Sequence, residues 1–363
     1  MAYELAPQPA SLFHEGLMKK TSKAVLGQLL KSVAESQYQF QEQSIFVIDS
    51  SYHLRAVILP PNTTYRQVYQ SYVSYIRKHF GLETIVVFDG YDSKNSTKVA
   101  EQQRRASKAV YRDILFDEDI TIISFLANGS NKSRLIEMIH KEFAHEGMSS
   151  NQAKADADSL SATTALTLSK LQPMQVVVIG TDTDLLVIFL SETTSQMNLH
   201  MCRKNPPIVH DIQAIQKAIG GTQIHLMTLH AITGCDTVSA LFSQGKLTTF
   251  QLADKEGLDF LNVFEHSESS KDDMAHAGKQ FLLKLYGAHG IYILNKYRYT
   301  CYNRSISRSS LPTSFRLKQQ PVQQQSHTPA ELISIQQWKG HQLDPTQWVW
   351  HIQDNMVVPV ETD

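Results

Sequence analysis

The chain has 363 residues, with 34 Lys and Arg against 35 Asp and Glu, 42% hydrophobic residues and 19% charged residues. This balance is that of a folded globular protein and excludes wholesale disorder. The formal net charge of -1 argues against a generic polyanion binder such as a histone or a basic coat protein, although a neutral chain can still segregate its charges.

The cysteines and the first ten residues indicate where in the cell the protein is expected. Cys202, Cys235 and Cys301 lie far apart and form no CxxC pair, which indicates a reducing, intracellular setting in the nucleus or cytoplasm. Met1–Ala10 has neither the basic nor the apolar region of a signal peptide. The strongest apolar runs are too short to cross a bilayer. We therefore expect a protein that is not secreted and has no membrane partner.

The predicted elements begin with an arm, residues 1–43, which contains a short amphipathic helix at Leu17–Leu30. A β/α alternation follows. Short apolar runs predict strands at Ser44–Ile48, Thr84–Phe88, Ile120–Phe125, Gln175–Ile179 and Met197–Cys202. Helical patterns predict helices at Tyr65–Phe80, Lys98–Ile114, Asn131–His145, Ala155–Leu171 and Asp211–Ile219. This alternation predicts an α/β fold with a twisted, mainly parallel sheet flanked by helices.

The C-terminal half has a different character. It is predicted to be mainly helical from His225 to Leu285. The expected core, 44–305, includes both the β/α alternation and this helical region. A Gln-rich stretch at 319–325 lies in a tail, 306–363, which holds all three tryptophans, Trp338, Trp348 and Trp350. That much aromatic surface should dock on the chain's own core or on a protein partner.

Aspartates gather at the predicted ends of strands and starts of helices. They are Asp49, Asp89 and Asp182 after strands, the last continuing as Asp182-Thr183-Asp184, then Asp156 and Asp158 at the start of a predicted helix, and Asp236 in the helical region. Each alone could be no more than a helix N-cap. In a parallel sheet, however, the strand-end carboxylates converge on one edge. Two carboxylates ~4 Å apart repel by about 4 kcal/mol at an effective dielectric near 20, so several together need a cation or shifted pKa values. Oxygen ligands without His or Cys suit Mg²⁺ or Mn²⁺, and a pair of such ions supports in-line attack of water on a phosphodiester.

The order of these motifs resembles the flap endonuclease/XPG group of 5′-nucleases, which have a PIN-like fold. Five segments carry the likeness in the family's order: Phe46–Asp49 (first strand), Val86–Gly90 ("VFDG"), Ala155–Asp158 ("EAEA" helix start), Ile179–Asp184 (D-x-D) and Thr233–Asp236 ("G-x-D"). The last opens the family's helix–turn–helix element, here 225–253. The phrase HAITGCD, His230–Asp236, is also similar to one in a loose group of uncharacterised eukaryotic proteins, some of which look derived from mobile elements.

The resemblance implies a PIN-like α/β core and a structure-selective nuclease that acts near a 5′ end or junction. It would hold two Mg²⁺ or Mn²⁺ ions through Asp49, Asp89, Asp156, Asp158, Asp182, Asp184 and Asp236. Two departures stand out. The family usually has Glu where this chain has Asp156 and Asp158, and before Ala155 the chain reads Ser149–Gln152 in place of a strand-like lead-in.

Basic residues point to a nucleic-acid partner, with DNA expected rather than RNA. The family has a basic segment after its second strand, where this chain carries Lys94, Lys98, Arg104, Arg105 and Lys108. Lys98 and Arg104 are expected to position the scissile phosphate; a plain solvated helix is the alternative. Gly245 and Lys246 would contact a duplex backbone from the helix–turn–helix loop. Lys296–Tyr299 alternates cations with aromatics, which suits stacking on single-stranded bases or an ordinary edge strand.

Two rival functions stay open at this stage. A nuclease-like fold used only for binding or as a scaffold is compatible with Asp at both helix positions and with the added tail. A haloacid-dehalogenase-type phosphohydrolase also uses a D-x-D pair, but on its first strand, which here ends Asp49-Ser50-Ser51. The second rival is therefore disfavoured.

Overall fold

The computed structural model describes residues 13–14, 17–31, 40–57, 65–90, 129–154, 157–171, 174–204, 207–220, 225–241, 244–308, 328–341, 343–347, 350–353 and 356–359. The chain divides into two compact units. Lys31–Ala218 forms one of them, called the sheet unit, and Met1–Leu30 with Ile219–Asp363 forms the other, called the helical unit. Each is described by itself.

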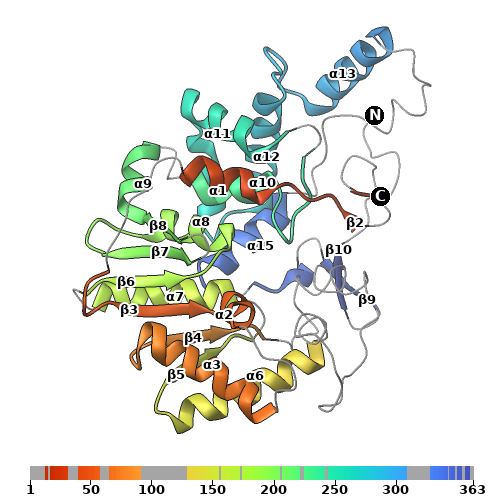
Figure 1. Ribbon diagram of the computed structural model, residues 1–363. Helices are drawn as coiled ribbons and strands as arrows, with labels where there is room; N and C mark the ends of the chain where they lie inside the picture. Colours follow the sequence, from red (N-terminus) through yellow and green to blue (C-terminus); the bar gives the residue numbers. More distant parts are fainter. Residues whose placement is uncertain are drawn as a thin grey trace. The chain divides into compact units, whose positions relative to one another are not determined.

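A six-stranded sheet of order β5-β4-β3-β6-β7-β8 forms the centre of the sheet unit (Figure 1). Its strands are β3 (Ile45–Asp49), β4 (Ile85–Phe88), β5 (Ser149–Gln152), β6 (Val176–Ile179), β7 (Leu199–Lys204) and β8 (Pro207–Asp211). Neighbouring strands run parallel except for β8, which returns antiparallel beside β7. The predicted α/β class with a mainly parallel sheet flanked by helices is confirmed.

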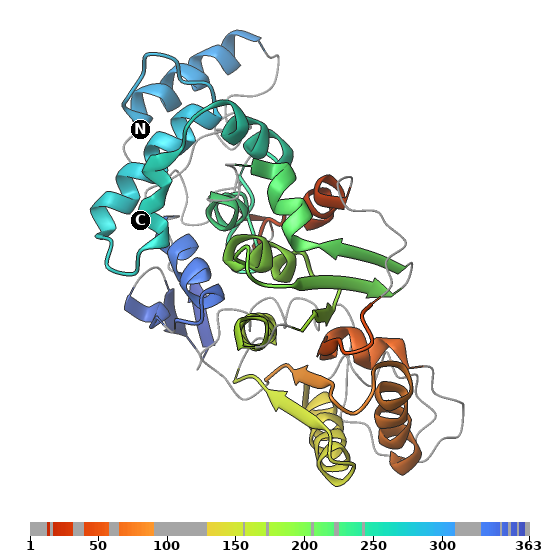
Figure 2. The ribbon, with the colours of Figure 1, turned by 90° about the vertical axis from the view of Figure 1, so that its left-hand side faces the viewer.

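Helices cover both faces of this sheet. They are α2 (Ser50–Ala56), α3 (Tyr65–Phe80), α6 (Gly129–His145), α7 (Ala157–Leu171), α8 (Thr183–Glu192) and α9 (Ile212–Ile219). Figure 2 shows α3 (orange) beside α6 (yellow). On their face of the sheet, Ile48, Phe88 and Ile179 share a core with buried residues of both helices. Because side chains alternate along a strand, residues 47, 49, 87 and 89 belong to the opposite face, where α7 packs on β3, β4 and β6.

Two strands of this six-stranded sheet were not predicted. β5, the polar segment Ser149–Gln152, is an edge strand whose residues are mostly exposed, so it carries no apolar run for sequence patterns to detect. It occupies the place where the resemblance called for a strand-like lead-in. β8 is an antiparallel hairpin partner that begins with a proline, which suits an edge position.

The helical unit is built from short helices and two small hairpins. Its elements are β1 (Phe13–His14), β2 (Leu17–Met18), α1 (Lys23–Lys31), α10 (Leu226–Ile232), α11 (Lys246–Lys255), the 3-10 helix η2 (Asp259–Glu265), α12 (Lys271–Leu285), α13 (Leu294–Arg308), α15 (Thr328–Trp338), the 3-10 turn η3 (Pro345–Gln347), β9 (Trp350–Gln353) and β10 (Met356–Pro359). α15 packs on α10, α12 and η2. Trp338 is buried, with its ring 5.6 Å from that of His230. This tryptophan of the predicted tail therefore docks on the chain's own core.

The division of the chain differs from the predicted arm, core and tail, 1–43, 44–305 and 306–363. The boundary between units falls after Ala218, and the N-terminal segment belongs with the C-terminal half. The N-terminal segment is joined to the C-terminal half by a backbone hydrogen bond, because the Ala240 amide donates to the Lys19 carbonyl at 2.8 Å. Leu26 and Leu30 of α1 are also buried.

Some predicted elements lie elsewhere or outside the described residues. The expected helix Lys98–Ile114 and strand Ile120–Phe125 fall in the undescribed part of the chain. The alternative of an edge strand at Lys296–Tyr299 is wrong, because these residues lie within helix α13. None of the helices that the structure describes is long and apolar enough to cross a bilayer.

Candidate metal centre at the carboxyl edge of the sheet

Asp49 ends the central strand β3 and begins the helix that follows. Its carboxylate accepts the Ser51 amide at 3.0 Å and the Ser51 hydroxyl at 2.6 Å, which makes it the N-cap of α2. The side chain is only 2% exposed. The N-cap role that each aspartate could have is therefore real for Asp49, but a cap does not require such complete burial.

Asp89 follows β4, the strand next to β3, on the same face of the sheet. Its Oδ1 atom accepts the Ala157 amide at 3.2 Å, and its Oδ2 atom lies 3.3 Å from the Lys132 ammonium. The residue after Asp89, Gly90, has to be a glycine. A Cβ atom there would lie 2.2 Å from the Ala153 carbonyl oxygen and 2.3 Å from that of Lys154, so no larger residue fits this chain crossing.

Asp158 lies in the first turn of α7 and is buried. Small residues on the buried side of this helix, Ala157, Ser161, Ala162 and Ala165, let it approach the sheet closely. Because the Ala157 amide donates a hydrogen bond to the Asp89 carboxylate, the start of α7 is held at the carboxyl end of β4. Asp156, the other carboxylate predicted at this helix start, lies outside the described residues.

Asp182 and Asp184 follow β6 on the other side of Asp49. Asp182 is the N-cap of α8, because its Oδ1 atom accepts the Asp184 amide at 2.9 Å. Asp184 is almost fully buried in the first turn of this helix, which is apolar on all sides. Gly180 places the segment beside β3, since a Cβ atom on it would lie 3.6 Å from the Asp49 Cβ atom.

Two other aspartates of this edge affect the electrostatics of Asp49. Burial first, then the charge of Asp158 and, to a smaller extent, that of Asp89, raise the pKa of Asp49 to about 7. The two bonds from Ser51 oppose this shift. Three predicted ligands from two strands and one helix therefore lie within electrostatic range of one point. Carboxylate oxygens in such a place are the donor set that Mg²⁺ or Mn²⁺ prefers.

Lys132, on α6, was missed by the sequence reasoning. Its ion pair with Asp89 is partly buried, with 17% of the lysine side chain and 22% of the aspartate side chain exposed. Nothing in the local pattern around Lys132 marks it, because the contact depends on how α6 packs at the end of β4. It offsets part of the negative charge that the aspartates bring together.

Asp236 belongs to the helical unit and has a cationic partner there. The Lys23 ammonium lies 2.9 Å from its Oδ1 atom, and the Lys20 ammonium donates to its main-chain carbonyl at 2.6 Å. The loop turns at Gly234, whose φ of +100° and close neighbour Ala240 require glycine. The predicted "G-x-D" turn is thus present, with its carboxylate in an ion pair to α1.

Lys246 does not lie on a nucleic-acid-facing surface, which corrects its predicted role. It is 2% exposed, and its ammonium donates to the His230 carbonyl at 2.9 Å, the Gly234 carbonyl at 2.8 Å and the Thr233 hydroxyl at 3.1 Å. These acceptors stand at the C-terminal end of α10, where a cation stabilises the helix. Gly245 is exposed at the start of α11.

The other predicted basic residues cannot be placed. Lys94, Lys98, Arg104, Arg105 and Lys108 lie outside the described residues.

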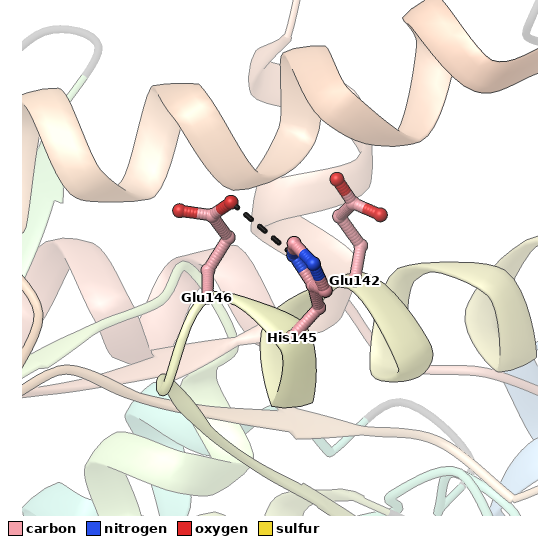
Figure 3. A group of neighbouring side chains, drawn as sticks. All are labelled: Glu142, His145 and Glu146. Atoms are coloured by element: carbon pink, nitrogen blue, oxygen red, sulfur yellow. Dashed lines mark ion pairs between the residues drawn. The ribbon is translucent and has the colours of Figure 1, made fainter.

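A different group of potential metal ligands lies at the C-terminal end of α6 and in the residue after it, as Figure 3 shows. Ligand atoms of Glu142, His145 and Glu146 all lie within 4.8 Å of one another. The aspartates that the structure describes at the carboxyl edge form no group that tight. The α6 group precedes β5, and so lies at the amino edge of the sheet. Arg77 already supplies a cation there, with its guanidinium 3.1 Å from Glu146.

Comparison with known proteins gives likeness in structure only. No protein-family model matches the chain, and no curated protein matches it. Among solved structures, the catalytic core of Rad2 in complex with DNA substrate is 16% identical with a TM-score of 0.39, covering 72% of this chain and 76% of that one. The D15 protein of T5, co-crystallised with metal ions, is 14% identical with a TM-score of 0.43, covering 76% and 97%. T5 5′-exonuclease with bound zinc ions is 15% identical with a TM-score of 0.42, covering 76% and 97%. Likeness at this level does not establish an activity for the chain.

Proposed function

We propose that this chain is a divalent-metal-dependent nuclease that hydrolyses phosphodiester bonds in DNA. The observation that carries the proposal is the setting of Asp49, a buried carboxylate at the end of the central strand with Asp89 and Asp158 close enough to raise its pKa. Buried groups with strongly shifted pKa values gather at functional sites. The motif order described above supports the nuclease class and a preference for a 5′ end or a junction.

The donor set fits Mg²⁺ or Mn²⁺, because it consists of carboxylate oxygens whose mutual repulsion a cation would offset. The residues proposed to hold two ions are Asp49, Asp89, Asp156, Asp158, Asp182 and Asp184. When bound, such ions lower the pKa of an attacking water and stabilise negative charge on the phosphate. Asp236, which the resemblance adds to this set, is paired with Lys23 within the helical unit.

The chain's own cations would orient the substrate. Lys98 and Arg104 are proposed to position the scissile phosphate, with Lys94, Arg105 and Lys108 extending the basic segment. The exposed Gly245 at the start of α11 remains a proposed contact for a duplex backbone. Lys246 is left out of this set because its ammonium is buried and bonded. An intracellular location is proposed on the cysteine usage alone.

The test is the double variant Asp182→Asn with Asp184→Asn. Asparagine retains the N-cap of α8 but removes two negative charges. We expect loss of Mg²⁺-dependent cleavage of labelled single-stranded, duplex, flap and hairpin DNA, weaker Mn²⁺ binding by calorimetry, and a retained fold by circular dichroism. Cleavage at the wild-type rate would overturn the mechanism.

Asp211→Asn is the matched control. Asp211 also ends a strand and caps the following helix, because its Oδ1 atom accepts the Ala214 amide at 3.0 Å. Because β8 runs antiparallel, this strand ends at the amino edge of the sheet. The control variant should cleave DNA and bind Mn²⁺ as the wild type does.

A catalytically degenerate nuclease fold that only binds or scaffolds is the second candidate. One observation favours it: lysines already neutralise Asp89 and Asp236, through Lys132 and Lys23 respectively. In a degenerate protein we expect no Mn²⁺ binding and no cleavage, with or without EDTA, while binding to nucleic acid persists. Calorimetry with Mn²⁺ therefore separates the two candidates.

A further inference from the structure

Basic residues are concentrated in one stretch of the helical unit. Residues 274–330 contain eight of the chain's 34 basic residues and none of its 35 acidic residues. The eight are Lys279, Lys284, Lys296, Arg298, Arg304, Arg308, Arg316 and Lys318. In a chain with a net charge of -1, this stretch alone is strongly positive. Such segregation is the electrostatic signature of a polyanion-binding surface.

Helix α13 lies within this stretch (Figure 1). One of its faces is buried. Leu294, Tyr297 and Arg298, at helical positions i, i+3 and i+4, are all buried. The Tyr297 hydroxyl donates to the Tyr286 carbonyl at the end of α12, and Arg298 donates to the Asn295 side chain. These contacts fix which side of the helix turns outward.

The outward face carries aromatic and cationic side chains together. Lys296, Tyr299 and Asn303, at i, i+3 and i+7, are exposed, as is Arg304 beside them. Tyr299 is 58% exposed, and Tyr292, two residues before the helix, is 89% exposed. Tyrosines this exposed present ring surface to solvent. With a lysine and an arginine one turn away, Tyr299 can stack on a base while the cations contact neighbouring phosphates.

We propose that α13 and the preceding residues 291–293 bind single-stranded nucleic acid. Tyr299 and Tyr292 would stack on unpaired bases, and Lys296 and Arg304 would contact the backbone. Duplex does not suit this surface, because its bases are already stacked on one another. An anionic membrane does not suit it either, since membrane-surface helices bury a broad apolar face. Among the side chains of α13 that the structure describes as exposed, Tyr299 is joined only by the polar residues Asn295, Lys296, Asn303 and Arg304.

This surface does not depend on the proposed cleavage, and binding can be measured without metal. The experiment titrates the full chain, in EDTA, into a fluorescent oligo-dT strand and, separately, a duplex of equal length, and follows anisotropy. Tyr299→Ala should weaken binding to the single strand about tenfold, and Tyr299→Phe should bind as the wild type does, because the phenyl ring retains the stacking surface. The affinity for duplex should not change in either variant.

The cations have their own readout. Lys296→Gln should reduce the slope of log affinity against log salt by about 0.7, the value for one phosphate contact on a single strand. Lys255→Gln, an exposed lysine on α11, is the control and should leave the slope unchanged. Melting curves from circular dichroism verify that each variant folds.

Three outcomes would overturn the proposal: equal single-strand affinity for Tyr299→Ala and the wild type, equal losses on single strand and duplex, or displacement of the oligonucleotide by anionic phosphatidylserine vesicles. Retained single-strand binding with no cleavage under any condition would refute the proposed nuclease and leave this surface intact.

Discussion

The Lys23 ammonium lies 2.9 Å from the Oδ1 atom of Asp236, so the first helix of the chain is bonded to the turn of the Gly-x-Asp motif. Lys20 adds bonds to the carbonyls of Cys235 and Asp236. With 21% and 14% of the two side chains exposed, the Lys23–Asp236 pair is screened less than a surface pair. The N-terminal segment therefore belongs structurally to this turn.

A double-mutant cycle measures that connection. Lys23→Met, Asp236→Asn and the double variant should show a coupling free energy of about 1 kcal/mol in urea unfolding, because each single variant leaves one charge without its partner. Lys284 and Glu256, a more exposed pair at 2.6 Å, should couple more weakly. Additive effects of the Lys23 and Asp236 substitutions would show that the contact contributes nothing to stability.

Lys246 should matter for stability and not for DNA binding. Lys246→Met leaves the carbonyls of His230 and Gly234 without a buried cationic donor, which we expect to cost roughly 2–3 kcal/mol in unfolding free energy. Lys255→Met, on the exposed side of the same helix, is the control and should cost little. If Lys246→Met weakened DNA affinity while the unfolding midpoint stayed unchanged, the buried structural role would be refuted.

The elements that were predicted correctly share one property, a pattern that is complete within a few neighbouring residues. The apolar run before Asp49 and the helical spacing of Tyr65–Phe80 are examples, and both elements formed where expected. Convergence of Asp49, Asp89 and Asp158 also follows from local signals, because parallel strands bring their ends together. In contrast, β5 has no apolar signal, since it is an exposed edge strand.

Charge partners could not be predicted for a physical reason. Lys132 meets Asp89, and Lys23 meets Asp236, only after distant segments pack together. Lys246 reads as a surface cation in a loop, yet packing buries it where carbonyls at the end of α10 need a donor. Sequence position indicates which residues are charged, whereas the tertiary structure decides what each charge faces.

Gly90 controls the position of Asp89. Gly90→Ala would place a Cβ atom against two backbone carbonyl oxygens, which cannot move aside as side chains do. We expect a loss of about 3 kcal/mol in stability, with weaker Mn²⁺ binding because the neighbouring carboxylate shifts. Gly180→Ala, whose new Cβ would meet only ordinary contacts from 3.4 Å outward, should unfold within about 1 kcal/mol of the wild type. Calorimetry and thermal melting measure both; equal stability of the two variants would contradict the crossing seen at Gly90.

His53 makes the sheet unit sensitive to acid. Its ring is fully buried against Tyr72, and burial lowers its pKa to about 4 from 6.5. Between these values the unfolded chain binds a proton that the folded chain does not, so stability falls as the pH drops from 6.5 to 4, by roughly 3 kcal/mol in all. His53→Gln should remove this part of the pH dependence, whereas the exposed His145→Gln should not. Urea unfolding at pH 7 and pH 5 tests the difference; identical pH dependence in His53→Gln and the wild type would refute it.

Asp49 changes stability with pH in the direction opposite to His53, and this direction distinguishes a metal ligand from a residue that only caps α2. Its pKa is raised to about 7 in the folded protein, against 3.8 ordinarily, so the folded chain holds the extra proton. The stability that this provides is complete below pH 3.8 and is lost as the pH rises through 7, by roughly 4 kcal/mol. Without metal at pH 8, Asp49→Asn should therefore raise the melting temperature, because asparagine removes the buried charge and still caps α2.

Adding Mn²⁺ at pH 8 should reverse the order of the two melting temperatures, so that the wild type melts above Asp49→Asn. The wild type gains stability because a cation offsets the repulsion among Asp49, Asp89 and Asp158, whereas Asp49→Asn gains less. At pH 5 in EDTA the variant should lose most of its advantage, since Asp49 of the wild type is then protonated. Scanning fluorimetry at both pH values, with EDTA or MnCl₂, measures all four conditions. If Asp49→Asn changed the melting temperature of the metal-free protein by the same amount at pH 8 as at pH 5, Asp49 would act only as the cap of α2, and the buried charge at this edge would have no bearing on metal binding.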